Sequence, residues 1–229
     1  MPDLIRHLSP NHGPRRDRAT PSLIVLHYTA MASTRAALHR LCDPAAEVSA
    51  HYLIGPEGTT YLLVAEDQRA WHAGAGEWAG ITDVNSHSIG IELANNGAEP
   101  FPHPQMLALE ALLRAIMARW AIQPWRIIGH SDMAPGRKSD PGPRFDWRRL
   151  ARQGLSVWPD HNPVSDQDPS PFRDFAAAFG YPLIVDDETL LQAFRRRFRP
   201  WATGPLEAQD MKLVQSIAQF PVDLPIHSA

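Results

Sequence analysis

The chain has 229 residues and a formal net charge of −3, so its charge gives no reason to expect nucleic acid or an anionic membrane as a partner. Hydrophobic residues make up 44% of the chain and charged residues 21%, which is typical of a soluble globular protein. The single cysteine, Cys42, excludes an internal disulfide and a zinc cluster of several cysteines. No apolar run approaches the ~20 residues of a membrane span.

The first third of the chain predicts a strand, a helix and a hairpin. No apolar periodicity marks the first 20 residues, and we expect an irregular lead-in there. Residues 23–29, LIVLHYT, form a short β-branched apolar run that predicts a buried strand. The stretch 33–42 suits a short helix with Ser33 as its N-cap. The segments HYLI and TTYLLV flank GPEG at 55–58, which favours a β-hairpin.

The middle of the chain continues this alternation of strands and helices. Residues 88–94, SIGIELA, alternate between large apolar and small or polar side chains and predict a strand. Apolar residues recur at helical spacing from 105 to 120, which predicts an amphipathic helix. The segment WRIIGH at 125–130 is typical of a strand that ends at His130. Strands that alternate with helices indicate an α/β fold, in which helices cover a sheet.

The composition changes after about residue 155. Residues 156–171, SVWPDHNPVSDQDPSP, hold four prolines and little apolar pattern, which indicates a linker or an extended wrap. Three helical stretches follow, so we divide the chain into a main domain at 1–155, this linker, and a small helical domain at 172–229. Beside the apolar stripe of the second stretch, four arginines are expected to form a solvated helix face: Arg195, Arg196, Arg197 and Arg199.

Two histidines lie at the ends of predicted strands. His27 ends the first strand and His130 the last, and a loop rich in proline and glycine follows His130. One such histidine is more often structural, but two histidines with a carboxylate and an open fourth position form a known kind of catalytic zinc site. Asp132 and Asp140 are both candidates for the carboxylate, because a rigid loop can fold back on itself. Spacing alone leaves that choice open.

Glu92 and Lys138 are the next candidates for chemistry. Glu92 lies on the polar side of the 88–94 strand, and a carboxylate buried in a sheet without a partner is costly. Either the strand exposes this side to water, or Glu92 is a general base for an attacking water. Lys138 is either an exposed loop lysine or the cation that stabilises a developing oxyanion.

Five motifs occur in order along the chain. They are HYTA at 27–30, VSAHYLI at 48–54, RAWHAG at 69–74, SIGIEL at 88–93 and GHSDMAPGRKSDPGPRFDW at 129–147. Together they resemble the zinc-dependent N-acetylmuramoyl-L-alanine amidases of the type-2 amidase family, over roughly residues 20 to 150. The resemblance implies a central mixed β-sheet flanked by helices, which agrees with the α/β pattern.

The resemblance also implies roles for single residues. It places the ligands of one zinc ion on three positions, His27, His130 and Asp140. Glu92 matches the family's catalytic glutamate and Lys138 its catalytic lysine. A tyrosine that some relatives carry just before HYLI is Ala50 here, and this departure places the chain with the glutamate-using subgroup.

Three further residues are candidates for substrate contacts. His72 resembles a groove residue that meets substrate in relatives, and its alternative is a structural histidine beside Trp71. Arg137 either meets a carboxylate of an acidic stem peptide or faces water. Asn95, near the end of the Glu92 strand, completes the set.

The activity implied is zinc-dependent hydrolysis of the amide bond between the lactyl group of N-acetylmuramic acid and L-alanine, in peptidoglycan or muropeptides. Two alternatives use the same fold or the same ligands: a recognition module that binds peptidoglycan without cutting it, and a zinc peptidase that cuts the stem peptide. Every ligand and catalytic position is filled here, which favours the hydrolase.

The C-terminal part and the N-terminus of the chain favour different cellular compartments. Residues from about 172 to 220 are similar to a three-helix peptidoglycan-binding module, and the alternative is a helical cap on the main domain. Such a tail is typical of relatives that act outside the cytoplasm. The N-terminus carries no apolar run of signal-peptide length, so we expect a cytoplasmic enzyme, or a periplasmic one if an export signal was trimmed. The sequence predicts neither the oligomeric state nor a need for the 1,6-anhydro sugar.

Overall fold

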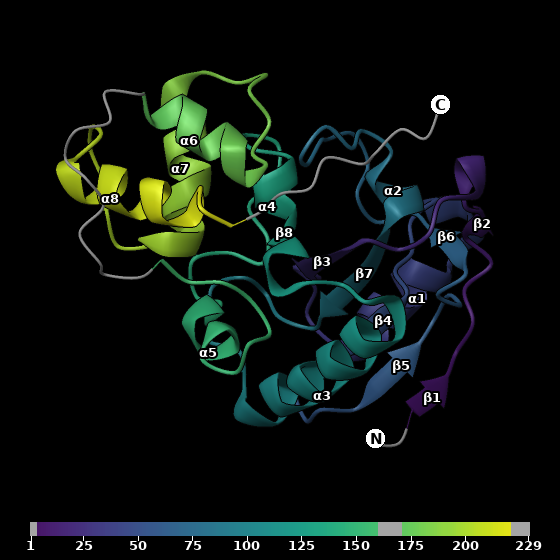
Figure 1. Ribbon diagram of the computed structural model, residues 1–229. Helices are drawn as coiled ribbons and strands as arrows, with labels where there is room; N and C mark the ends of the chain where they lie inside the picture. Colours follow the sequence, from purple (N-terminus) through teal and green to yellow (C-terminus); the bar gives the residue numbers. More distant parts are fainter. Residues whose placement is uncertain (1–3, 160–170, 221–229) are drawn as a thin grey trace.

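The computed structural model describes residues 4–159 and 171–220, and its centre is a six-stranded sheet (Figure 1). The strand order is β1 (Leu4–Arg6), β5 (Thr60–Leu62), β4 (Tyr52–Ile54), β7 (Ser88–Leu93), β3 (Leu23–Tyr28) and β8 (Ile127–Gly129). Strands β4 and β5 are antiparallel, whereas every other neighbouring pair is parallel. The predicted α/β fold with a central mixed sheet is therefore confirmed, as is the hairpin.

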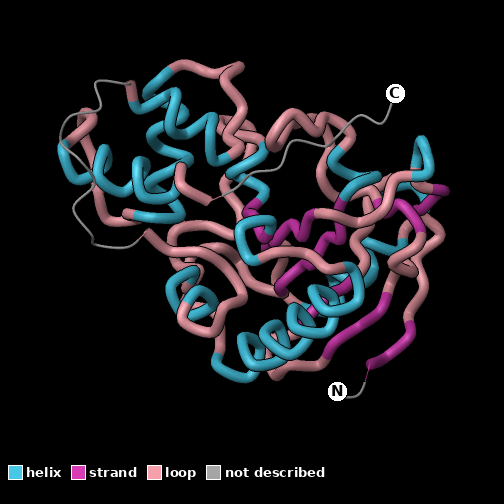
Figure 2. The backbone as a smooth tube through the Cα atoms, viewed as in Figure 1, coloured by secondary structure: helices cyan, strands magenta, loops and turns pink. Residues whose placement is uncertain are grey.

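Helices surround this sheet, and a small ribbon lies apart from it (Figure 2). The ribbon pairs β2 (His12–Pro14) with β6 (Gln68–Ala70). The α-helices are α1 (Thr34–Cys42), α2 (Val84–His87), α3 (His103–Trp120), α4 (His130–Met133), α5 (Trp147–Ala151), α6 (Phe172–Phe179), α7 (Asp187–Phe198) and α8 (Ala208–Ile217). Single 3-10 turns span Arg16–Arg18, Pro44–Ala46 and Pro124–Arg126. Among the described helices, none is long and apolar enough to cross a membrane.

Two apolar layers lie on opposite sides of the central strands. Along β3, Ile24 and Leu26 pack with α3, whereas Leu23 and Val25 pack with α6, α7 and α8. Side chains alternate along a strand, so the next residue of the second series, His27, points to the same side as Leu23 and Val25. On that side of β3, the first residues pack against helices α6, α7 and α8, and His27 follows near the carboxyl end of the strand.

The same alternation places Glu92 on the side of His27. In β7 the residues Ile89, Ile91 and Leu93 belong to the α3 layer, so Glu92 points to the opposite side. His27 is paired directly with Glu92 across the parallel strands. Two polar side chains from distant parts of the sequence therefore lie side by side on one face of the sheet.

Helix α1 begins as predicted, and three helices form in the C-terminal part. The Ser33 hydroxyl accepts a hydrogen bond from the Ala36 N–H at 3.1 Å, which caps α1. Helices α6, α7 and α8 share one apolar cluster with β3 and β8, and they lie together at one end of the molecule (Figure 1). The division into two domains stays a prediction, and residues 160–170 of the expected linker lie outside the described part of the chain.

The expected irregular lead-in is wrong. Residues Leu4–Arg6 form β1, which pairs in parallel with β5, and His12–Pro14 pair with β6. Leu4 is 41% and Ile5 is 44% exposed, because β1 is an edge strand. An edge strand this short is held by backbone hydrogen bonds and leaves no apolar alternation in the sequence.

The expected strand at 125–130 is shorter than predicted. A 3-10 turn occupies Pro124–Arg126, β8 covers Ile127–Gly129, and His130 begins α4. Pro124 opens that turn, and the Arg126 N–H donates within it to the Gln123 carbonyl at 2.9 Å, so the strand starts one residue later. His130 thus stands at the junction of a buried strand and a short helix.

The solvated face expected for the arginine run is wrong for two of its members. Arg195 is 5% and Arg197 is 2% exposed. Arg195 donates to both carboxylate oxygens of Asp210 on α8, and Arg197 donates to Asp132 on α4. Neighbouring elements cover both positions, so these two arginines are buried with carboxylate partners instead of facing water.

Candidate metal centre

A pocket of about 370 Å³ opens at the carboxyl ends of β3 and β7, and His27, Glu92, His130 and Asp140 all line it. His27 is supplied by β3 and Glu92 by β7. His130 follows β8 directly, and the loop after α4 brings Asp140 back toward both histidines. Ligand crevices at the carboxyl ends of parallel strands are a general feature of open α/β sheets.

Three side chains of this pocket converge on one point. Asp140 Oδ2 lies 2.8 Å from His27 Nδ1 and 3.0 Å from His130 Nδ1, and the two nitrogens are 3.0 Å apart. All three residues are buried. Within the described residues, this is the one group of three or more histidine, cysteine or acidic side chains with the geometry to hold a metal ion. The competing carboxylate, Asp132, points elsewhere and pairs with Arg197.

The tautomer of His130 is fixed by a backbone carbonyl. His130 Nε2 lies 2.8 Å from the carbonyl oxygen of Ala73. A carbonyl only accepts, so Nε2 carries the proton. With that proton on Nε2, Nδ1 is the atom of His130 that can offer a lone pair to a metal ion, and it points toward Asp140.

A chain of hydrogen bonds fixes His27 in the same way. The Ser88 hydroxyl donates to the Val84 carbonyl at 2.6 Å, so its oxygen accepts from His72 Nε2 at 3.2 Å. His72 Nδ1 is then an acceptor and receives the proton of His27 Nε2 at 3.1 Å. Burial lowers the pKa of His27 to about 4 and that of His72 well below its usual value, so both rings are neutral. His27 Nδ1 is therefore also a bare lone pair.

The converging atoms fit a zinc ion. Two imidazole lone pairs and a carboxylate oxygen within about 3 Å of one another repel unless a cation lies between them. Two histidines and one carboxylate form a donor set of the kind that catalytic zinc sites use. Each histidine also donates a hydrogen bond from its other ring nitrogen, which fixes the orientation of the ring. The residues present therefore fit the metal that the sequence led us to expect.

His72 lies behind His27, where we expect it to support the metal. A Cβ atom at position 90 would lie 2.4 Å from Cγ of His72, so only the glycine at Gly90 leaves room for the ring. We predict that His72→Ala weakens zinc binding about 10- to 100-fold, as loss of an outer hydrogen-bond partner typically does. Chelator competition measures this, and His87→Ala, which removes a histidine outside the pocket, should leave the affinity unchanged. Equal affinity in the two variants would contradict the support role.

The loop after α4 is held in place by close contacts. The Ser131 N–H donates to the Asp140 carbonyl at 2.9 Å. A Cβ at Gly129 would lie 2.8 Å from Cδ of Pro141, so this approach also needs glycine. Arg137 donates to the carbonyls of Ala73 and Ala75, which ties the loop to the neighbouring segment. These contacts hold the loop, and with it Asp140, in one position, as the prolines and glycines of the sequence led us to expect.

Of the three remaining predicted site residues, two line the pocket and one does not. Lys138 is exposed and lines the same pocket as the ligands. Arg137 lines it too, with its guanidinium on the loop carbonyls. Asn95 accepts from the Gly97 N–H at 2.7 Å and donates to the Glu99 carbonyl at 3.3 Å, and it does not line the pocket.

Two supporting groups were missed in the sequence. The Ala73 carbonyl carries no side-chain signal that could have revealed its contact with His130. Ser88 could have been found, because alternation along the strand puts it on the same side as Gly90 and Glu92.

Glu92 is poised for proton transfer. Its Oε2 atom is buried and has no hydrogen-bond partner in the described part of the chain. Burial, with the charge of Asp140 adding to it, raises the pKa of Glu92 to about 8. A carboxyl group in a pocket with a raised pKa is a candidate for proton transfer, and the charge of a zinc ion bound beside it would lower that pKa and leave Glu92 free to accept a proton.

The raised pKa of Glu92 gives a stability prediction for chelator-treated protein. Folded Glu92 holds its proton to about pH 8, whereas the unfolded side chain releases it near the ordinary value of 4.5. The folded state binds more protons in that window, so the unfolding free energy falls as pH rises, by up to about 1.4 kcal/mol per unit. Urea unfolding of wild type and Glu92→Gln from pH 5 to 8 measures this. Wild type should lose stability relative to Glu92→Gln as pH rises, because glutamine has no proton to release, and a difference that stays constant with pH would contradict the raised pKa of Glu92.

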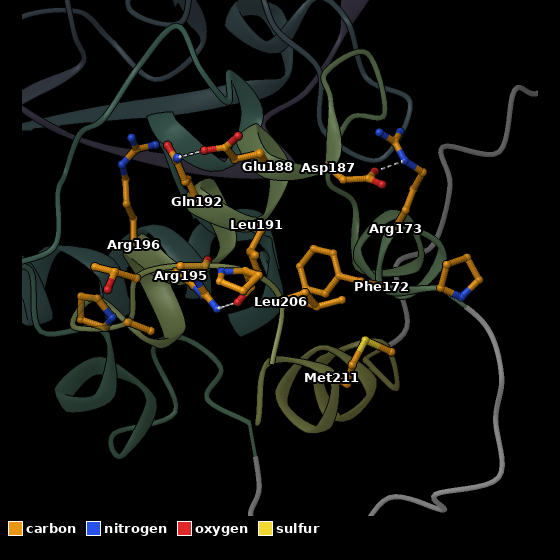
Figure 3. A pocket seen from close by; sticks show the side chains of 16 residues that line it. Phe172, Arg173, Asp187, Glu188, Leu191, Gln192, Arg195, Arg196, Leu206 and Met211 are labelled. Carbon is orange, nitrogen blue, oxygen red and sulfur yellow. Dashed lines mark hydrogen bonds and ion pairs between the residues drawn. The ribbon is translucent and has the colours of Figure 1, made fainter. Parts of the chain in front are cut away.

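A larger pocket of about 1040 Å³ lies among the C-terminal helices (Figure 3). Its floor is apolar and is formed in part by Phe172, Leu191 and Met211. Charged residues line it too, among them Arg173 and Asp187, which form an ion pair at 2.7 Å. It brings together no group of metal-binding side chains among the described residues, so the chemistry belongs to the smaller pocket.

Comparison with known proteins agrees with this geometry. The sequence pattern of the family described as N-acetylmuramoyl-L-alanine amidase matches residues 17–143. The chain is 34% identical to N-acetylmuramoyl-L-alanine amidase AmiD of Escherichia coli over 232 residues, covering 86% of this chain and 82% of that protein. It is 35% identical to 1,6-anhydro-N-acetylmuramyl-L-alanine amidase AmpD of Escherichia coli, covering 62% of this chain and 87% of that protein.

A solved structure is similar over nearly the same length. It is the complex of Escherichia coli AmiD with anhydro-N-acetylmuramic acid-L-Ala-D-gamma-Glu-L-Lys. The TM-score is 0.78 at 33% sequence identity, and the match covers 88% of this chain and 90% of that one. A match of that length extends beyond the family pattern at residues 17–143.

Proposed function

The chain belongs to the N-acetylmuramoyl-L-alanine amidase family, and from that premise we propose that it hydrolyses the bond between the lactyl group of N-acetylmuramic acid and L-alanine at a centre of one zinc ion. The observation that carries the proposal is the convergence of three bare acceptors beside an unpartnered Glu92. Muropeptides or peptidoglycan fragments are the substrates. The AmiD structure similar to this chain holds an anhydromuramyl peptide.

His27, His130 and Asp140 would hold the zinc ion. When bound there, zinc supplies a Lewis acid that polarises the scissile carbonyl and makes water more acidic. The hydrogen bonds that His27 donates to His72 and that His130 donates to the Ala73 carbonyl keep both Nδ1 atoms aimed at the ion. All three of these residues are buried.

Glu92 carries the proton from water to the leaving group. Its Oε2 atom accepts a proton from the attacking water, whose oxygen forms a bond to the lactyl carbonyl carbon. Glu92 then gives that proton to the L-alanine nitrogen as the C–N bond breaks. The products are a muramic acid carboxylate and a free stem peptide, and Glu92 returns to its starting state.

Lys138 stabilises the oxyanion that forms during the attack. Its side chain is exposed and shares the pocket with Glu92 and the metal ligands. We predict that Lys138→Met lowers kcat about 10²- to 10³-fold, which is the usual cost of losing one such donor. Steady-state kinetics on a muropeptide measure it. The chain has one other lysine, Lys212 on α8, and Lys212→Met should keep full activity. Equal rates in the two variants would remove Lys138 from the mechanism.

Mass spectrometry of the products tests the bond that is cut. Purified muropeptides with and without the 1,6-anhydro sugar are incubated with the protein. Release of an intact stem peptide that begins at L-alanine supports the proposal, and the relative rates show which sugar is preferred. Cleavage within the stem would mean a peptidase. Binding without any cleavage would mean a recognition module.

Two expectations about the tail and the compartment stay proposals. We propose that α6, α7 and α8 bind polymeric peptidoglycan, which cosedimentation of the full chain with purified cell-wall sacculi tests. The cytoplasm, with the periplasm as the alternative, stays the expected location, and fractionation of cells that express the full-length gene would decide it.

A further inference from the structure

One buried ion pair joins the C-terminal helices to the segment that carries His130. Arg197 on α7 donates from Nη1 to Oδ2 of Asp132 on α4 at 2.7 Å, and both side chains are 1% exposed. The Tyr181 hydroxyl donates to the other oxygen of Asp132 at 2.9 Å. Both oxygens of this buried carboxylate therefore have partners from residues that follow the linker.

The same guanidinium also holds the strand that precedes His130. Arg197 Nη2 donates to the carbonyl of Ile127 on β8 at 3.1 Å. Asp132 Oδ2 in turn accepts the N–H of Gly129 at 2.8 Å, which closes the turn between β8 and α4. The contacts of Arg197 thus lie on both sides of His130 along the chain, three residues before it and two after.

The carboxylate ligand is tied to the same turn. The Ser131 N–H donates to the Asp140 carbonyl, and Gly129 lies against Pro141. Trp147, which also packs near Gly129, lies under the Arg197 guanidinium at 4.2 Å from its ring centre. A movement of the turn would therefore displace His130 and Asp140 together.

We propose that Arg197 is a positioning residue for the metal centre: through Asp132 and Ile127 it fixes the β8–α4 turn and so aims His130 and Asp140. The C-terminal helices are then part of the catalytic unit, apart from any binding of the cell wall. The inference rests on the zinc site proposed above. Arg197 contacts neither the metal ligands' donor atoms nor the pocket.

Zinc affinity of the full chain tests this role independently of activity. The zinc Kd of Arg197→Met is measured by competition with a fluorescent chelator, and the visible spectrum of the cobalt(II)-loaded protein reports the ligand geometry. We expect zinc binding about 10- to 100-fold weaker than wild type and a changed cobalt spectrum. Tyr181→Phe removes one hydrogen bond from Asp132 and keeps the ion pair. Tyr181→Phe should change the zinc Kd and the cobalt spectrum in the same direction as Arg197→Met, but to a smaller extent. It replaces Arg197→Met as the test if that variant does not fold.

Helix α7 supplies a matched control. Arg195 is also buried and also pairs with an aspartate, but its partner is Asp210 on α8, within the helical layer. Arg195→Met should lower the melting temperature and leave the zinc Kd and cobalt spectrum unchanged.

Unchanged metal binding in folded Arg197→Met and in Tyr181→Phe would overturn the inference and leave the proposed function standing. Equal weakening by Arg195→Met would overturn it too, since the effect would then be general loosening. A wild-type chain that binds no zinc would overturn both the proposed function and the inference.

Discussion

We expect Glu92→Gln to lose about two to four orders of magnitude in kcat while still binding zinc and substrate. Glutamine keeps the size of the side chain but cannot accept the proton of the attacking water. Glu92 Oε2 is buried and has no partner among the described residues, so no neighbouring side chain is ready to replace it. The change is measured by steady-state kinetics on a purified muropeptide, with KM followed separately from kcat.

The control for Glu92→Gln is its zinc content. Glu92 is not one of the three converging donors, so the variant should bind one zinc ion with wild-type affinity. A loss of activity that came with a loss of zinc would make Glu92 a structural residue of the centre. A variant with nearly full kcat would remove Glu92 from the reaction.

Asp140→Asn should abolish zinc binding and with it the activity. The carboxylate is the one anionic donor of the three, and it lies 2.8 Å and 3.0 Å from the two histidine nitrogens. A neutral amide leaves the site with no charge to offset that of the ion, so we expect a larger loss than the ~10- to 100-fold cost of an outer partner. Metal analysis of the purified variant and chelator competition measure it.

Asp146→Asn is the matched control for Asp140→Asn. Asp146 is exposed on the same loop and caps α5 by accepting from the Arg149 N–H at 2.9 Å. Asparagine caps a helix about as well as aspartate does, so the variant should keep its stability as well as its zinc and activity. A zinc-loaded, active Asp140→Asn would show that Asp140 is not a ligand, and Asp132 could not replace it from its pair with Arg197.

The sequence predicted the elements of the main domain well where apolar patterns are local. The strand at β3, the hairpin, the capped helix α1 and the long helix α3 each follow from spacing within about ten residues. The histidines could be assigned to strand ends for the same reason. Strand β1 could not be predicted, because an exposed edge strand of three residues is specified by its partner β5 and not by its own pattern.

The pairing of His27 with Glu92 depends on contacts between distant segments. Alternation puts each residue on one side of its own strand, but only the parallel register of β3 and β7 brings them together. The choice of Asp140 over Asp132 is of the same kind. Ten residues of loop separate Asp140 from His130, and hydrogen bonds of the folded chain decide where it points.

For two arginines of α7, the sequence predicted exposure to water where the structure shows burial. Charged residues at the edge of an apolar stripe usually face water, so Arg195 and Arg197 were expected on a solvated face. Each is buried because an aspartate from another element meets it: Asp210 from α8 and Asp132 from α4. Burial of this kind has no local signal, since the partner of Arg197 lies 65 residues away along the chain.

Stoichiometric reconstitution with zinc tests the account most directly. The protein is stripped with a chelator, zinc is added back in fractions of an equivalent, and release of stem peptide from a muropeptide is followed at each step. We predict no hydrolysis in the stripped protein and a linear rise in rate that ends at one zinc ion per chain. Hydrolysis that persists after zinc has been removed, or that needs a second equivalent, would contradict a single centre of His27, His130 and Asp140.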